Sequence, residues 1–184
     1  MTARPAKTVL KRLILAVLLV PILLILIALF LPSKYRVERK EIIKATPESI
    51  QPWLAQLQRW PQWTVWNTNF DPTLVFTFRG PAEGAGAEMS WTARSGNGSL
   101  KLTSADPKTG VTYELNFEQG KFVSHGGVTF APAEAGATTV TWFNEGSLGW
   151  NPVWRYLGLL MDKMMGTEFE KNLGNLKQKV EPKG

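Results

Sequence analysis

The stretch Asn151–Val180, NPVWRYLGLLMDKMMGTEFEKNLGNLKQKV, carries the strongest structural signal in the chain. Asn151 followed by Pro152 is typical of a helix start, because asparagine caps free backbone N–H groups and proline fits the first helical position. Gly166 interrupts the stretch, and Thr167–Glu170 reads as a capping box that could restart a helix, so we expect a kink or break there. Apolar residues recur every three or four positions, which predicts a long amphipathic helix; they are Trp154, Leu157, Met161, Met165, Phe169, Leu173, Leu176 and Val180.

A series of short strands precedes this helix, between Thr73 and Glu145. Because each strand is short and its connection is local, we expect an antiparallel meander. Tyr35–Ile43 also alternates for most of its length and predicts a further strand, which makes seven. The turn sequences that separate the six strands are Gly80–Gly86, Ser95–Gly98, Asp106–Gly110, Gln119–Gly120 and Pro132–Gly136.

Side chains alternate along these strands, so that one face of the predicted sheet is apolar and the other is wet. The amphipathic helix is expected to cover the apolar face. That face collects Leu74, Phe76, Phe78, Met89, Trp91, Leu100, Leu102, Val111, Tyr113, Leu115, Phe117, Phe122, Val128, Phe130, Val140 and Trp142.

Two short helices are predicted between the first strand and the rest. Thr46 is a candidate cap, and Pro47 suits the first helical position. Ile50 to Leu57 then carries apolar residues at helical spacing, with Pro52 expected to kink or shorten the helix. A second short helix or turn is expected at Arg59–Trp63.

The N-terminal run Leu13–Leu31, LILAVLLVPILLILIALFL, contains no charged or polar side chain. A helix of this length measures roughly 28 Å, which is close to the hydrocarbon thickness of a bilayer. A cleaved signal peptide is the alternative, but no A-x-A pattern follows the run. We therefore predict a basic tail and single transmembrane anchor at residues 1–33 and one domain at residues 34–184.

Charge is distributed unevenly between these two parts. Residues 1–44 carry nine Lys/Arg and two Asp/Glu, a net +7, whereas residues 45–184 carry twelve and thirteen, a net −1. The domain therefore lacks the basic face that nucleic-acid binding requires, and we expect no nucleic-acid partner. The basic flanks fit membrane lipids or ordinary topology signals equally well. We expect a single-pass protein of the cell membrane, with the short basic tail inside and the domain outside the cytoplasm.

Signals for catalysis are weak. His125 is the only histidine, and its position in the alternation places it on the wet face. The chain has no cysteine, and no His/carboxylate cluster has the spacing of a metal site. Gly84–Gly86 lacks the strand-then-helix context of a phosphate-binding loop. We predict no catalytic residue, no metal and no cofactor. Tyr113 and Asn144 are the best polar groups on the inward face.

Several segments resemble the START-like SRPBCC superfamily, in its polyketide cyclase/dehydrase-like branch with an N-terminal membrane helix. They are Ala45-Thr46-Pro47, Trp60-Pro61-x-Trp63-x-x-Trp66-Asn67, Gly84-x-Gly86-x-x-x-x-Trp91, Thr141-Trp142 and Leu148-Gly149-Trp150-Asn151-Pro152. The resemblance covers about residues 35–180. It implies an α+β helix-grip fold, in which a seven-stranded curved antiparallel sheet surrounds the C-terminal helix, with an internal pocket for a hydrophobic ligand.

We therefore expect a membrane-anchored domain that binds a hydrophobic small molecule or lipid without catalysis. The alternatives are a cyclase- or dehydratase-type enzyme using the same cavity, or an accessory subunit that meets a membrane-protein partner through the anchor. The tryptophans could line the pocket or form the core, and Trp60–Trp66 could instead rest at the membrane interface. The methionines could also simply fill gaps. The pocket candidates are Trp66, Phe76, Met89, Trp91, Tyr113, Phe117, Trp142, Asn144, Leu157, Met161 and Met165.

Overall fold

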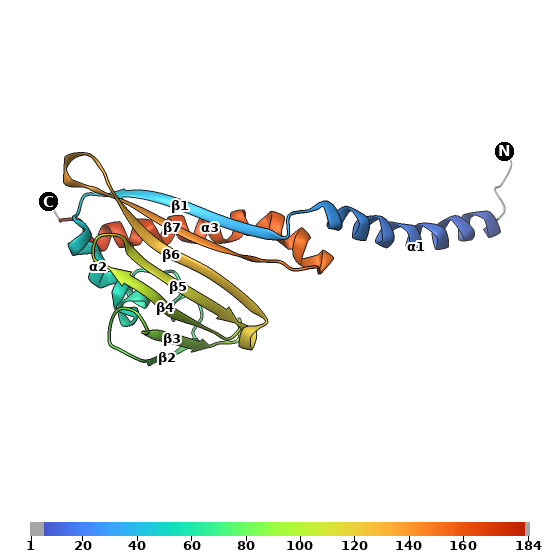
Figure 1. The fold of residues 1–184 in the computed structure, drawn as a ribbon. Helices are drawn as coiled ribbons and strands as arrows, with labels where there is room; N and C mark the ends of the chain where they lie inside the picture. The colour runs from blue at the N-terminus through green and yellow to red at the C-terminus, as the bar shows by residue number, and fades with distance from the viewer. Residues whose placement is uncertain (1–5, 183–184) are drawn as a thin grey trace.

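The computed structural model describes residues 6–182, with side chains at 11, 12, 15 and 17–182. Figure 1 shows a curved sheet against the long helix α3, with α1 extending away from the sheet. The elements are α1 (Ala6–Phe30), β1 (Lys34–Ile43), α2 (Pro47–Ala55), η1 (Leu57–Gln62), β2 (Val75–Arg79), β3 (Glu88–Thr92), β4 (Gly98–Asp106), β5 (Gly110–Phe117), η2 (Glu118–Gly120), β6 (Phe122–Pro132), η3 (Glu134–Gly136), β7 (Thr138–Ser147) and α3 (Pro152–Val180).

Within residues 6–182 the strands form a single seven-stranded antiparallel sheet in the order β1-β7-β6-β5-β4-β3-β2. The predicted strands and turns are therefore confirmed. β2 to β7 pair with their neighbours in sequence, and β1 pairs with β7 from Lys34 opposite Ser147 to Ile43 opposite Thr138. This pairing places the residues that follow α1 beside the residues that precede α3.

The core lies between the concave face of the sheet, the segment α2–η1 and α3. Trp60, Trp63 and Trp142 are essentially inaccessible to solvent. The ring of Phe169 stacks on Trp142 with centroids 4.7 Å apart. Trp60 donates its indole N–H to the Leu54 carbonyl at 3.0 Å, so its burial leaves no unsatisfied donor. The predicted inward face is confirmed in the middle of the sheet, where Met89, Leu100, Leu102, Val111, Tyr113, Val128 and Val140 are also buried.

The first short helix begins at the predicted residue, and the second begins two residues before the predicted one. α2 starts at Pro47 with Thr46 as its N-cap residue, although the Thr46 side chain makes no capping hydrogen bond. The helix contains Pro52 and ends after Ala55. η1 occupies Leu57–Gln62, close to the second short helix expected there.

The predicted break in α3 is wrong, because α3 continues through Gly166 without interruption. A Cβ atom at Gly166 would collide with the guanidinium group of Arg39, which lies across the helix at this point. Arg39 binds Asp162 at 2.8 Å and Glu170 at 2.6 Å, one turn before and one turn after the glycine. Because Gly166 has no side chain, the guanidinium group of Arg39 fits against the helix there. The Thr167 hydroxyl donates a hydrogen bond to the Lys163 carbonyl within the same helix, so it does not cap a new one.

α1 is continuous from Ala6 to Phe30, including Pro21. Among the residues whose side chains are described, no helix is both long enough and apolar enough to cross a membrane. The predicted transmembrane helix is therefore not supported; of its residues, the side chains of 13, 14 and 16 lie outside the described set.

Candidate ligand cavity

A cavity of about 350 Å³ opens between the concave face of the sheet, the segment that connects η1 to β2, and the middle of α3. Its walls are mostly apolar and aromatic. Trp66 and Phe70 belong to the connecting segment, and Phe76 belongs to β2. The residues that α3 contributes are Met161, Met164, Met165, Glu168 and Phe169. Strands β3, β4 and β5 and the end of β7 contribute Met89, Trp91, Leu100, Tyr113, Leu115, Phe117 and Asn144.

Nine of the predicted pocket residues line this cavity, whereas Trp142 and Leu157 do not. The nine are Trp66, Phe76, Met89, Trp91, Tyr113, Phe117, Asn144, Met161 and Met165. Trp142 is completely buried because Phe169 covers one face of its ring and Trp60, Trp63 and Trp66 surround it. Leu157 is exposed, because it lies on the outer side of the first turns of α3.

Several residues that line the cavity were not among the predicted pocket residues. Phe70 and Asp71 belong to an irregular segment, where the alternation of a strand carries no information. Met164, which is 60% exposed, and Phe70, which is 64% exposed, contribute apolar side chains at the solvent side of the cavity. The spacing of Met164, three residues after Met161, was the available signal for its place near the cavity.

Two aromatic walls of the cavity lie against glycines on the neighbouring strand. Trp91 pairs with Gly98, and Tyr113 pairs with Gly126. A Cβ atom at either glycine would collide with the aromatic ring opposite it. The rings therefore lie down along the sheet instead of standing up from it, which leaves open volume above them. Such aromatic–glycine pairs across strands are a sequence signal for this geometry once the register is known.

The polar groups on the cavity wall are paired with one another. The Trp142 indole donates to the Tyr113 hydroxyl at 2.9 Å. Asn144 accepts from the Tyr35 hydroxyl at 2.9 Å and donates to the Ser124 hydroxyl at 3.2 Å. Burial raises the pKa of Tyr113 to about 12, so its hydroxyl stays neutral at physiological pH and can donate a hydrogen bond.

Carboxylates at the edge of the cavity are also engaged. Glu168 accepts from the Trp66 indole at 3.0 Å. Asp71 accepts from Thr73 and from Ser95, and these hydrogen bonds lower the pKa of Asp71 to about 2. Both carboxylates therefore stabilise the segment around the cavity. His125 is exposed on the outer face of the sheet, as predicted. Among the described side chains, no group of three or more His, Cys, Asp or Glu could hold a metal ion.

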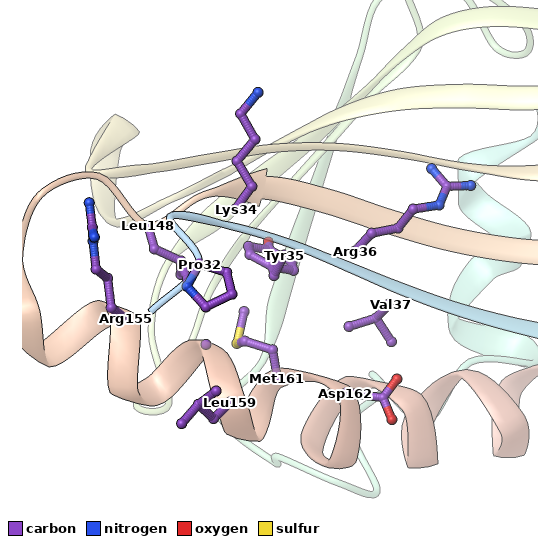
Figure 2. Close-up of a pocket in the computed structure, with 11 residues that line it drawn as sticks. Pro32, Lys34, Tyr35, Arg36, Val37, Leu148, Arg155, Leu159, Met161 and Asp162 are labelled. Atoms are coloured by element: carbon purple, nitrogen blue, oxygen red, sulfur yellow. The ribbon is translucent and has the colours of Figure 1, made fainter. Parts of the chain in front are cut away.

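A second, smaller pocket of about 150 Å³ lies between β1 and the first half of α3, beside Pro32, as Figure 2 shows. Pro32, Leu148 and Leu159 are among its apolar lining residues. Met161 lines both pockets. The Tyr35–Asn144 hydrogen bond also joins a residue of the small pocket to a residue of the large one. One methionine and one hydrogen-bonded pair therefore contribute to the wall between them.

The fold has many solved counterparts at low sequence identity, whereas no curated protein sequence matches the chain. A protein from Chromobacterium violaceum is 19% identical and superposes with a TM-score of 0.52, over 83% of this chain and 99% of that one. The Aha1 dimer from Colwellia psychrerythraea is 17% identical with a TM-score of 0.53, over 79% and 96%. One half of the di-domain ARO/CYC protein StfQ, from the steffimycin biosynthetic pathway, is similar with a TM-score of 0.60 at 10% identity, over 80% of this chain and 50% of StfQ.

At these identities the structures establish the fold alone, which is the helix-grip fold expected from the sequence. The family model is more specific, since it matches residues 34–181, which include all seven strands, α2 and the whole of α3. The resemblance to the polyketide cyclase-like branch is thereby confirmed, and the chain belongs to the family described as polyketide cyclase / dehydrase and lipid transport.

Proposed function

We propose that residues 34–184 bind a hydrophobic small molecule or lipid in the large cavity without transforming it. The observation that carries this proposal is the cavity itself, which has about 350 Å³ of open volume and mostly apolar walls. Pockets of this size and character are typical of small-molecule sites. Tyr113 and Asn144 would orient a polar end of the ligand.

The pairing of the wall polar groups favours binding over catalysis. A general base needs a pKa near the working pH, whereas burial raises the pKa of Tyr113 to about 12. Asn144 does not titrate, and Glu168 is held by the Trp66 indole. These groups suit a site that recognises a ligand, and a cyclase- or dehydratase-type reaction would need an acid or base that is free to act.

The proposal includes attachment of the chain to the cell membrane through α1. The described large apolar side chains of α1, from Leu15 to Phe30, are 43% to 89% exposed, so the rest of the chain leaves them uncovered. A continuous apolar surface of this kind needs a cover, and lipid supplies one. The domain would lie outside the cytoplasm, and a topology reporter fused after Gly184 tests that placement.

Native mass spectrometry of the full chain, released from detergent micelles, tests the binding proposal. Leu115→Trp fills the cavity, because Leu115 lines it. Val123→Trp adds the same ring at an exposed position outside it, on the neighbouring strand β6. We expect a copurified hydrophobic molecule with the wild type and with Val123→Trp, and loss of that molecule with Leu115→Trp.

Two results would contradict the proposal. One is wild-type protein that carries no bound molecule when prepared from its own membrane. The other is equal retention by Leu115→Trp, which would place the molecule elsewhere, for example on α1.

A second candidate role is attachment to a membrane-protein partner, and the exposed apolar surface of α1 is the observation that favours it. Exchange of Leu13–Leu31 for an unrelated membrane anchor distinguishes the two roles. A partner that copurifies with the native chain and is lost on exchange supports the second role, whereas an unchanged bound molecule supports the first.

A further inference from the structure

The segment Ser147–Met161, which joins β7 to the first turns of α3, contains a single charged residue, Arg155. That residue is buried, with only 6% of its surface exposed. The outer surface of this segment therefore presents no described charge to its surroundings. It is also apolar, since Trp150 is 82% exposed, Val153 is 63% exposed and Leu160 is 50% exposed.

Arg155 is directed toward the end of α1. Its Nη1 atom donates to the carbonyls of Ala28, Leu29 and Leu31 at 3.0 to 3.2 Å, and its Nε atom donates to the Gly149 carbonyl at 3.1 Å. The last carbonyls of a helix carry a partial negative charge and lack helical partners, so a buried cation is well placed there. α1 has no basic residue in its own last turn, and α3 provides the cation instead.

A second hydrogen bond fixes which residues of α1 lie beside the first turns of α3. The Tyr156 hydroxyl donates to the Leu24 carbonyl at 2.8 Å. Leu24 precedes the end of the apolar run at Leu31 by roughly 10 Å of helix, at about 1.5 Å per residue. Figure 1 likewise shows the start of α3 beside the end of α1. The first turns of α3 therefore share the surroundings of the last two turns of α1.

We propose that the lipid surrounding α1 also covers the start of α3, so that Trp150, Val153, Leu157 and Leu160 lie in the bilayer interface. This inference rests on the proposed membrane attachment of α1. A tryptophan at the end of such a surface is typical of the headgroup region. Because Leu159 and Met161 line the small pocket, that pocket would then open beside the lipid, with Met161 between it and the large cavity.

The outer side of the same helix changes character farther along. Thr167, Lys171 and Gln178 are exposed there, in place of apolar residues. Lys171 follows Val153, and Gln178 follows Leu160, by five turns of helix, so each pair faces the same direction. A lipid surface that covers only the first turns of α3 accounts for this change.

Spin labelling of the full chain tests the inference, because the chain contains no cysteine and a single introduced cysteine carries the only label. Val153→Cys and Leu160→Cys place labels on the proposed lipid surface, and Lys171→Cys and Gln178→Cys are their matched controls. Leu19→Cys reports on α1 independently. Each variant is reconstituted in vesicles of phosphatidylcholine and phosphatidylglycerol, and collisions with oxygen and with a water-soluble nickel chelate are measured.

We expect the ratio of oxygen to nickel accessibility at positions 153 and 160 to exceed that at 171 and 178 several-fold. Equal ratios at all four positions, with Leu19→Cys in lipid, would overturn this inference and leave the membrane attachment standing. Labels at 153 and 160 that neither reagent reaches would also overturn it, because a protein partner would then cover the surface. A water-exposed label at Leu19→Cys would overturn both the attachment and the inference.

Discussion

The two halves of α3 have similar hydrophobic spacing but very different surroundings. Residues 165–180 contribute Phe169, Leu173 and Leu176 to the core, and their outer side is polar. Residues 152–164 touch the end of α1, form part of two pocket walls and leave Val153 and Leu160 exposed. One half of the helix holds the domain together, and the other half connects it to α1 and to the candidate ligand.

The difference follows from what the sheet and the short helices enclose. α2, η1 and the residue that follows η1 contribute apolar side chains to the core, which closes around the second half of α3; they are Ile50, Leu54, Leu57, Trp60 and Trp63. No such layer covers the first half among the described residues. β1 and the last turns of α1 lie against it, and the ring of Phe122, at the start of β6, packs edge-on against Trp154 with centroids 4.5 Å apart. Periodicity therefore reports which side of a helix can be buried, and tertiary packing decides along which length it is buried.

Substitution of a buried side chain in the second half should produce the largest effect. Phe169→Ala removes the ring stacked on Trp142 and should lower the free energy of unfolding by about 3–5 kcal/mol. Val153→Ala in the first half should change it by no more than about 0.5 kcal/mol, because Val153 is exposed. Denaturant unfolding of the full chain in micelles measures both free energies. If the two substitutions lower the free energy of unfolding equally, the two halves of α3 do not differ in their contribution to stability.

Removal of the buried cation Arg155 should produce the second-largest loss of stability. Arg155→Leu leaves the carbonyls of Ala28, Leu29 and Leu31 without this donor and should cost about 2 kcal/mol. It should also increase cleavage by trypsin after Lys34, next to the junction of α1 and β1. Arg36→Leu is the control, since the exposed ion pairs of Arg36 with Glu38 and Glu145 and its contact with the exposed side of the Phe143 ring each contribute about 0–1 kcal/mol. An Arg155→Leu protein as stable as this control would show that the contact with α1 is incidental.

Two glycines of α3 should respond in opposite directions to the same change. Gly174→Ala meets no neighbouring atom within 4 Å and should stabilise the protein by about 1 kcal/mol through helix propensity. Gly166→Ala should instead destabilise it by about 1 kcal/mol or more, because the methyl group displaces Arg39 from Asp162 and Glu170. Thermal unfolding measures the signs, and stabilisation by both substitutions would mean that Arg39 relocates freely.

The smallest effect should be a pH dependence at the boundary between the halves. Hydrogen bonding to Arg39 lowers the pKa of Asp162 below its ordinary value of 3.8. A carboxylate with a lowered folded-state pKa stabilises the protein above the ordinary value, and this stabilisation is lost as the pH falls through the lowered one. The difference in Tm between wild type and Asp162→Asn should therefore be constant above pH 5 and shrink below 3.8. If the difference in Tm stays the same below pH 3.8, the effect of Asp162→Asn does not arise from the charge of Asp162.

The sheet was largely predictable because its signals are local. Turn residues such as Gly96 and Gly110 have positive φ, and they lie in turns that separate alternating strands. The same alternation placed Met89, Trp91 and Tyr113 on the cavity side. Phe70 was not predictable in this way, since an irregular segment has no alternation. Gly166 was misread as a helix break because the arginine that occupies its open side comes from β1.

The amino-acid sequence by itself determined the strands, the inward face, the helix starts and the family, because alternation, turn chemistry and capping act over a few residues. Tertiary structure alone decided that Trp142 belongs to the core, since its burial depends on Phe169 and on three tryptophans distant in the chain. It likewise decided that Arg155 meets the carbonyls of α1, across more than 120 residues. Interactions of that kind depend on the path of the whole chain, which no local pattern encodes.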